Sequence, residues 1–176
     1  TIGGGIVEKN FLGKGINLNA NLEISDEKVK GQFIYSKPNF NYTDNTLFTS
    51  VRSTSTDRKK DFGYESTDLG FTVGTKFEQY ENLFFSPEID LSLEELKTTS
   101  DASDNFKKQA GNYEDFYFNY GLDYDLRNST YKPSSGSKTY FSQTLPIVST
   151  NNEINNTFIF TKYQKLDRET DMIGKI

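Results

Sequence analysis

Two pairs of carboxylates are the residues whose type and spacing could do chemistry in this sequence. Glu88 and Asp90 stand two positions apart, as do Asp123 and Asp125. Two neighbouring acids can serve as general acid and base or bind a cation. Both pairs, however, lie in segments where apolar and polar residues alternate, so each pair projects from the polar face of one β-strand. This setting favours the polar lining of a water-filled interior over a catalytic or cation site.

Other kinds of reactive site find no support. The chain has no His and no Cys, which excludes Ser-His-Asp and Cys-His constellations and ordinary zinc sites. The glycines at positions 3, 4, 5, 13 and 15 suggest a phosphate loop only superficially, because that motif needs a following helix and residues 16–24 have a strand pattern. Asp101 and Asp104 lack the spacing of a calcium loop. We therefore expect no enzyme activity, no cofactor and no metal.

Composition narrows the class of protein. Hydrophobic residues make up 34% of the 176 residues, the mean hydropathy is −0.70, and no apolar run approaches the ~18 residues of a transmembrane helix. Fifteen Phe and eleven Tyr argue against disorder. The net charge of −5 argues against a nucleic-acid partner. With no cysteines, no compartment can be inferred from disulfides.

The strongest pattern is a period of two. From Phe116 to Leu126 every second residue is apolar or aromatic, and the residues between them are mostly small, polar or acidic. Residues 16–24 and 83–94 alternate in the same way. Strands of soluble domains usually run about five or six residues, whereas a tilted strand needs roughly 9–11 to cross a bilayer. The length of these segments predicts a membrane β-barrel.

The whole chain divides into strands joined as hairpins, with no helical period. About nine strands are expected, at residues 2–10, 16–24, 29–36, 47–54, 64–77, 83–94, 116–126, 138–148 and 153–165. Short turns are expected at residues 13–15, 42–45 and 79–82, and long charged loops at residues 55–61 and 95–112. Further turns are expected at residues 25–28, 149–152 and 167–171. Short turns at one rim and long loops at the other are typical of an outer-membrane barrel.

Alternation also predicts which face each side chain takes. The apolar set expected to face lipid comprises Leu18, Leu22, Phe71, Ile89, Leu91, Phe118, Tyr120 and Leu122. The polar set expected to line the lumen comprises Asn19, Glu88, Asp90, Asn119 and Asp123. Turn residues expected at the periplasmic rim are Gly13, Gly15, Pro38, Pro133 and Gly136. A soluble β-sandwich binding module alternates too, but strand length and loop asymmetry argue against it.

Four motifs carry a resemblance to a known family. They are residues 10–15 (NFLGKG), 37–40 (KPNF), 118–125 (FNYGLDYD) and 131–137 (YKPSSGS). In this order and at these spacings the chain resembles the surface-antigen D15 barrel domain of the Omp85 family over nearly its whole length. It departs from the family pattern at Asn128, where an acidic residue is common, and at Phe11, where tryptophan is frequent. These departures leave the subfamily open.

The resemblance implies an all-β, antiparallel, up-and-down barrel of sixteen strands preceded by periplasmic POTRA domains. Residues 1–176 would be a partial barrel of about nine strands, without the POTRA domains and the first and last strands. The implied location is the bacterial outer membrane. The implied function is to fold and insert other β-barrel proteins there, and another Omp85-type translocation pore or a passive channel is the alternative. The implied partners are outer-membrane lipids and lipopolysaccharide, unfolded outer-membrane protein clients and accessory lipoproteins.

Overall fold

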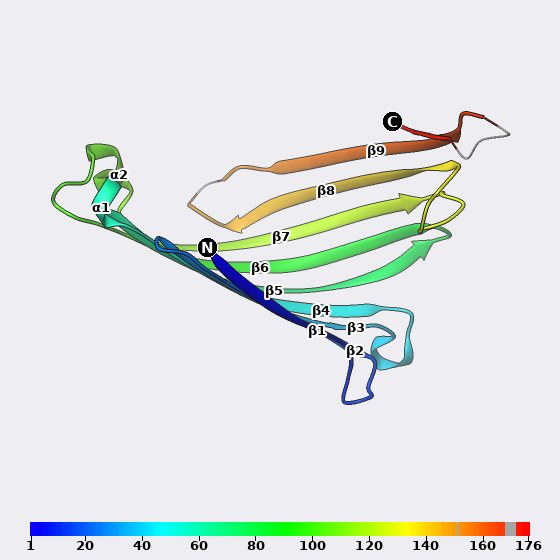
Figure 1. Ribbon diagram of the computed structural model, residues 1–176, viewed down its shortest axis with the longest axis horizontal. Helices are drawn as coiled ribbons and strands as arrows, with labels where there is room; N and C mark the ends of the chain where they lie inside the picture. The colour runs from blue at the N-terminus through cyan, green and yellow to red at the C-terminus, as the bar shows by residue number, and fades with distance from the viewer. Residues whose placement is uncertain (151, 168–171) are drawn as a thin grey trace.

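One open antiparallel sheet makes up the fold (Figure 1). The computed structural model describes residues 1–150, 152–167 and 172–176, and across them ten strands pair in sequence order, each with its neighbours along the chain. The strands are β1 (Ile2–Phe11), β2 (Ile16–Ile24), β3 (Lys28–Lys37), β4 (Thr46–Arg58), β5 (Tyr64–Tyr80), β6 (Leu83–Thr98), β7 (Gly111–Asp125), β8 (Gly136–Val148), β9 (Asn155–Lys165) and β10 (Ile173–Lys175). The predicted partial barrel is confirmed, and the strands of these described residues form one sheet instead of the two stacked sheets of a sandwich.

Several strands are longer than the alternation predicted. β4 continues to Arg58 and β6 to Thr98, so much of the loop expected at residues 55–61 and the start of the one expected at 95–112 belong to strands. The ladder continues through polar pairs such as Ser55 with Thr67. Threonine favours extended backbone even where no apolar face is needed, and each added pair supplies backbone hydrogen bonds. The prediction of loops at residues 55–58 and 95–98, which was based on their polar composition, was therefore wrong.

Two short helices fill what remains of those connections, where no helix was predicted. They are α1 (Lys59–Phe62) and α2 (Asp104–Gln109), and Figure 1 shows them together at one end of the sheet. Gly63 ends α1 with a φ of 73°, and its carbonyl accepts a hydrogen bond from the Thr99 N–H at 2.8 Å. Tyr64 stacks on Phe106 with ring centroids 4.6 Å apart. The two connections therefore form one ordered cap.

No helix in the described part of the chain is long and apolar enough to cross a membrane.

The other end of the sheet carries the β1–β2 turn, the 3₁₀ turn η1 (Phe40–Tyr42) between β3 and β4, the tight β5–β6 turn and residues 126–135 between β7 and β8. This last connection is nearly as long as residues 99–110 at the opposite end. The difference in loop length between the two ends is thus smaller than predicted. The predicted turns at residues 149–152 and 167–171 include residues outside the described part of the chain.

The sheet has almost no interior of its own. Among the described residues, the buried apolar side chains are Ile16 and Ala102, at 9% and 4% exposure. Many large apolar side chains of the strands, such as Leu22, Phe71 and Leu91, stay exposed on one face. A soluble domain buries such residues between layers. This sheet is a single wall with two different surfaces.

Candidate functional site

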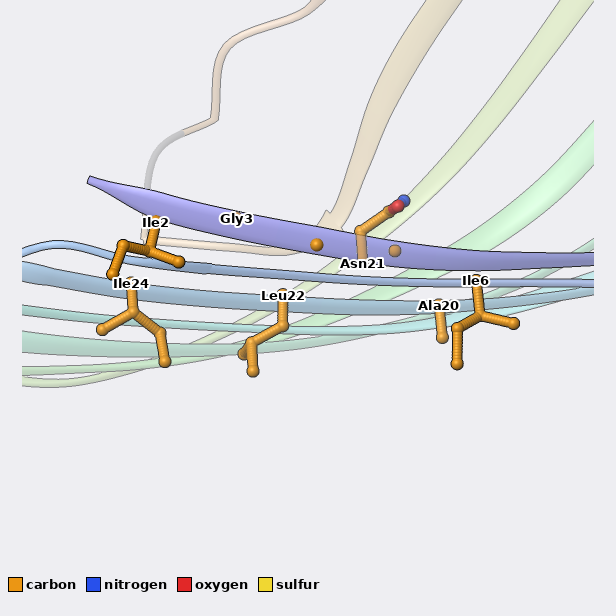
Figure 2. A pocket seen from close by; sticks show the side chains of 9 residues that line it. Ile2, Gly3, Ile6, Ala20, Asn21, Leu22 and Ile24 are labelled. Carbon is orange, nitrogen blue, oxygen red and sulfur yellow. The ribbon is translucent and has the colours of Figure 1, made fainter.

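The register of the strands sorts the side chains onto two faces. One row across the sheet runs Asn19, Ile34, Ser50, Thr72, Asp90 and Tyr117, and the adjacent row runs Leu18, Tyr35, Thr49, Val73, Ile89 and Phe118. Successive residues of a strand point to opposite faces. Every residue of the predicted lumen set therefore shares one face, and every residue of the predicted lipid set shares the other. Figure 2 shows Asn21 on the side toward which the sheet curves, with Ile6, Leu22 and Ile24 on the opposite side.

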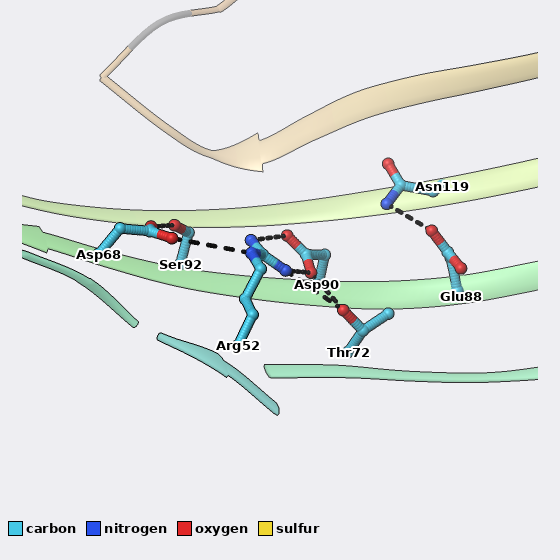
Figure 3. Close-up of polar contacts among 7 residues, drawn as sticks. All are labelled: Arg52, Asp68, Thr72, Glu88, Asp90, Ser92 and Asn119. Atoms are coloured by element: carbon cyan, nitrogen blue, oxygen red, sulfur yellow. Dashed lines mark hydrogen bonds and ion pairs between the residues drawn. The ribbon is translucent and has the colours of Figure 1, made fainter. Parts of the chain in front are cut away.

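An arginine bridges three strands on the polar face (Figure 3). Arg52 on β4 donates from both terminal nitrogens to Asp90 on β6, at 2.7 and 3.0 Å. The Thr72 hydroxyl of β5 donates to the same carboxylate at 2.6 Å. On its other side the Arg52 Nε lies 3.8 Å from Asp68, which also accepts from the Ser92 hydroxyl at 2.8 Å. A bidentate pair held by further hydrogen bonds is more rigid than an isolated surface ion pair.

Glycines on the polar face make room for these long side chains. A Cβ at Gly70 would collide with the guanidinium of Arg52, which lies across β5 to reach β6. In the same way, a Cβ at Gly74 would collide with the ring of Phe48. Both glycines have ordinary strand backbone, so the close approach of a neighbouring side chain explains them. The polar face is therefore covered by side chains that lie flat along it.

A second polar group occupies the same face of β6, β7 and β8. The Asn119 amide donates to Glu88 at 3.0 Å, and Asp123 lies 2.9 Å from Lys138. Between these pairs lies a hollow of about 200 Å³ over the small residues Ser86 and Gly121. Of the five polar side chains predicted for this face, Glu88, Asp90, Asn119 and Asp123 lie on the adjacent strands β6 and β7. Asn19 lies on the same face but farther away, on β2.

The opposite face is apolar and partly aromatic. Phe77 meets Phe85 edge to face at 5.7 Å, and Phe85 and Tyr120 lie 6.2 Å apart between centroids. A shallow apolar hollow of about 430 Å³ also lies along β1 and β2, lined by Ile2, Ile6, Leu22 and neighbouring residues (Figure 2). These side chains are available to an apolar medium rather than to a second protein layer.

The height of this apolar face can be worked out on β6. All six of its outward positions from Leu83 to Leu93 are apolar: Leu83, Phe85, Pro87, Ile89, Leu91 and Leu93. Rising about 3.3 Å per residue, this stretch runs for ~33 Å. At a tilt of about 40° it covers ~25 Å of height, which is the apolar band of an outer-membrane barrel.

Some residues of both faces were not found from the sequence. Arg52 lies in a segment whose Ser and Thr residues weaken the alternation, and nothing singled it out. The large side chains Phe48 and Phe84 lie on the polar face by register. Gln143 and Asn156 lie on the apolar face. For Arg52 and Phe48 the sequence offered one signal, a glycine inside the neighbouring strand, which marks the close approach of another side chain.

The predicted turn residues gather at one end of the sheet. Gly13 and Gly15 have φ of 67° and 66°, and Pro38 and Pro133 lie in the connections after β3 and β7. The assignment of Gly136 as a turn residue is corrected: it is the first residue of β8. It has a φ of 97°, and a Cβ there would collide with the backbone of the preceding connection.

Charged pairs stand at both ends. In the β7–β8 connection the Arg127 Nε donates to Asp125 at 2.7 Å, and this hydrogen bond raises the pKa of the guanidinium above its usual value. At the other end Lys59 lies 2.5 Å from Glu65, whose carboxylate raises the pKa of the ammonium. Within the described residues no three candidate metal-ligating side chains come together. The arrangement is that of a two-faced wall with charged rims.

Comparisons with known proteins decide the family. No curated protein matches the sequence. The profile of the Omp85 superfamily domain matches residues 10–175. The chain belongs to the Omp85 superfamily. Among solved structures, this Omp85 chain is similar to BamA from Haemophilus ducreyi lacking POTRA domains 1–3, with a TM-score of 0.71 and 22% identity.

That match covers 95% of this chain and 35% of the BamA chain, so the Omp85 chain spans about a third of the solved structure's length. At this level of identity the likeness shows a shared fold, the antiparallel wall of an outer-membrane barrel. An Omp85 barrel places the protein in the bacterial outer membrane. The predicted family, fold class and location are confirmed.

Proposed function

We propose that this Omp85 chain is part of the barrel wall of a factor that folds and inserts other β-barrel proteins into the outer membrane. The observation that carries the proposal is the two-faced sheet: an apolar face of membrane height on β6, and a polar face held by the Arg52–Asp90 pair. Membership of the Omp85 superfamily and the likeness to a BamA barrel support the choice of function.

The apolar face, including Leu18, Ile89 and Leu122, contacts lipids and lipopolysaccharide, and the polar face lines a water-filled interior. The work is non-covalent. A client strand in lipid cannot leave its backbone N–H and C=O groups unpaired, so pairing with a barrel edge lowers the cost of its insertion. This chain supplies the rigid wall behind such an edge and needs no cofactor. Its partners are unfolded outer-membrane proteins and accessory lipoproteins, and not nucleic acid.

The experiment uses the full-length gene product that contains this segment, reconstituted in liposomes. A urea-unfolded β-barrel client is added, and its folding is followed by the gain of protease resistance. We expect faster client folding than in empty liposomes or in liposomes carrying an unrelated porin of equal mass. A client folding rate equal to that with the porin contradicts the proposal.

A translocation pore or passive channel is the second candidate. The observation that favours it is the continuous polar face, whose paired charges suit the lining of an aqueous passage. Planar-bilayer recording of the same full-length protein separates the two functions. A pore gives steady open-state conductance without accelerating client insertion, whereas an assembly factor accelerates insertion whatever its conductance.

A further inference from the structure

Four rows of side chains on the apolar face change in character along β5, β6 and β7. Each row joins residues that are directly paired in the register. From the middle of the strands toward the cap, the rows are Phe71–Leu91–Phe116, Leu69–Leu93–Glu114, Thr67–Glu95–Asn112 and Glu65–Lys97. Successive rows are two residues apart, or ~7 Å along the strand. The surface therefore passes from hydrocarbon to hydroxyl, amide and carboxylate groups and ends with an ammonium group.

Two hollows lie along these rows and join each other. The first has a volume of about 340 Å³ and is lined mainly by the first two rows. The second has a volume of about 290 Å³ and is lined mainly by the second and third rows. Leu69, Leu93 and Glu114 border both hollows, so the two form a single groove, which we name the outer groove. Each of its three strands has both of its sheet neighbours in the described chain.

The change from apolar to polar rows falls at the end of the apolar band. Leu93 is the last apolar outward residue of β6 before the cap, and Glu95 follows two positions later. At about 3.3 Å per residue and a tilt of about 40°, this step raises the side chain by ~5 Å. The turns assigned to the periplasmic rim lie at the opposite end of the sheet. The polar rows therefore lie at the height of the headgroups of the outer leaflet.

The polar rows fit a headgroup that carries both hydrogen-bond donors and negative charge. The carboxylates of Glu95 and Glu114 only accept hydrogen bonds, whereas the Asn112 amide donates and accepts. The Lys97 ammonium lies 2.8 Å from Glu95, but its side chain is 58% exposed, and its three N–H donors can also serve an anion. Lipid A combines sugar hydroxyl and amide donors with phosphates and acyl chains. Its parts thus match the groove in the order of the rows.

We propose that the outer groove binds one molecule of lipopolysaccharide through its lipid A. An acyl chain lies in the apolar hollow, the sugar donates to Glu95 and Glu114, and a phosphate lies beside Lys97. The proposal rests on the lipid-facing wall of the proposed function, and on the assignment of the cap to the cell exterior. It adds a defined lipid site to a face that otherwise meets the membrane at large.

Lipid binding by the full-length protein in detergent tests the site. Diphosphoryl lipid A is the probe, and phosphatidylglycerol is the comparison, because it carries a phosphate and hydroxyls but no sugar. Native mass spectrometry counts the lipids that stay bound. We expect one lipid A to be retained at concentrations at which phosphatidylglycerol is lost. Equal retention of the two lipids overturns the proposal.

A double variant ties the bound lipid to the groove. Lys97→Gln with Asn112→Leu removes the ammonium and the amide, and both side chains are exposed, so the barrel should still fold, as its heat-modifiable gel mobility reports. We expect the affinity for lipid A to fall about tenfold. The control is Lys60→Gln, which removes the same charge from α1 outside the four rows. An unchanged affinity, or an equal fall in the control, overturns the proposal.

Photo-crosslinking in living cells tests the place of the groove in the membrane. Benzoylphenylalanine replaces Phe116 in the groove, and in a second protein it replaces Phe85, on the same face near the opposite end of the apolar band. We expect lipopolysaccharide adducts from the 116 probe and phospholipid adducts from the 85 probe. Lipopolysaccharide adducts from the 85 probe alone would reverse the two rims and overturn the proposal. Adducts without lipid at both positions would remove the lipid-facing assignment as well.

The proposed function is tested separately from the lipid site. The client-folding assay can be run in liposomes of phospholipid alone, where no lipopolysaccharide is present. A protein that accelerates client folding there but shows no preference for lipid A loses the outer groove as a binding site and keeps the proposed function. A protein that prefers lipid A without accelerating client folding loses the proposed function and keeps the site.

Discussion

Replacing Ile89 with arginine is the sharpest test of which face meets the membrane. Ile89 lies within one residue of the middle of the apolar stretch from Leu83 to Leu93, so its distance from the bilayer midplane is only ~3 Å along the strand. Its side chain is 39% exposed on the apolar face, with no acid beside it in its row. An arginine on the lipid face costs about 2–4 kcal/mol at the midplane and about 0–1 near the interfaces. We expect Ile89→Arg to cost 2–4 kcal/mol on this scale.

The matched control is Ser86→Arg, three residues away on the same strand and on the polar face. Ser86 borders the hollow of about 200 Å³ over Gly121, which has room for a long side chain and borders Glu88. We expect it to cost less than about 1 kcal/mol. The measurement is the urea midpoint of the full-length protein folded into lipid vesicles. Equal losses for the two variants would refute the assignment of faces, because an arginine in water-filled space and one in hydrocarbon cannot cost the same.

Three further predictions concern the polar face and one rim. A double-mutant cycle between Arg52→Ala and Asp90→Ala should give a coupling free energy of about 1 kcal/mol. The coupling should shrink in high salt, because the Arg52 side chain is 32% exposed. A coupling of zero would show that the pair is not formed. Gly70→Ala should displace the guanidinium of Arg52, so Asp90→Ala should lower the stability less in the Gly70→Ala variant than in the parent protein. If the stability losses of the two substitutions simply add, this prediction is wrong. Gly136→Ala should lower stability by about 1–3 kcal/mol, which is more than Gly13→Ala should. Both glycines have a positive φ, but of the two only Gly136 lacks space for a Cβ. The urea midpoints of the two variants give the comparison.

The centres of the strands could be predicted from the sequence because one face is apolar and the other polar, which gives the side chains a period of two. Residues 55–58 and 95–98 stay in strands although they are mostly polar, and no alternation in the sequence marks such a segment. The helices α1 and α2 are too short to have a period of their own.

The faces of the sheet were predictable for the same reason, but the contacts across them were not. Alternation places Asp90 on the polar face without showing that Arg52, thirty-eight positions earlier, will bind it. That contact depends on the register of two hairpins and on the gap at Gly70. The hydrogen bonds from Tyr120 to Gln143 and from Gln143 to Asn156 were not predicted, because Gln143 and Asn156 occupy positions that the pattern assigns to apolar residues.

The side chains that lie flat over glycines have a consequence for how this wall can evolve. Gly70 has no room for a Cβ while Arg52 keeps its place, because the three atoms nearest to such a Cβ all belong to the Arg52 side chain. A larger residue at position 70 therefore requires a change at position 52. Gly74 differs, because a Cβ there would also meet the Glu88 Cβ and the Pro87 backbone oxygen, so a change of Phe48 alone makes no room. In an alignment of relatives, positions 52 and 70, which are paired across two neighbouring strands, should covary.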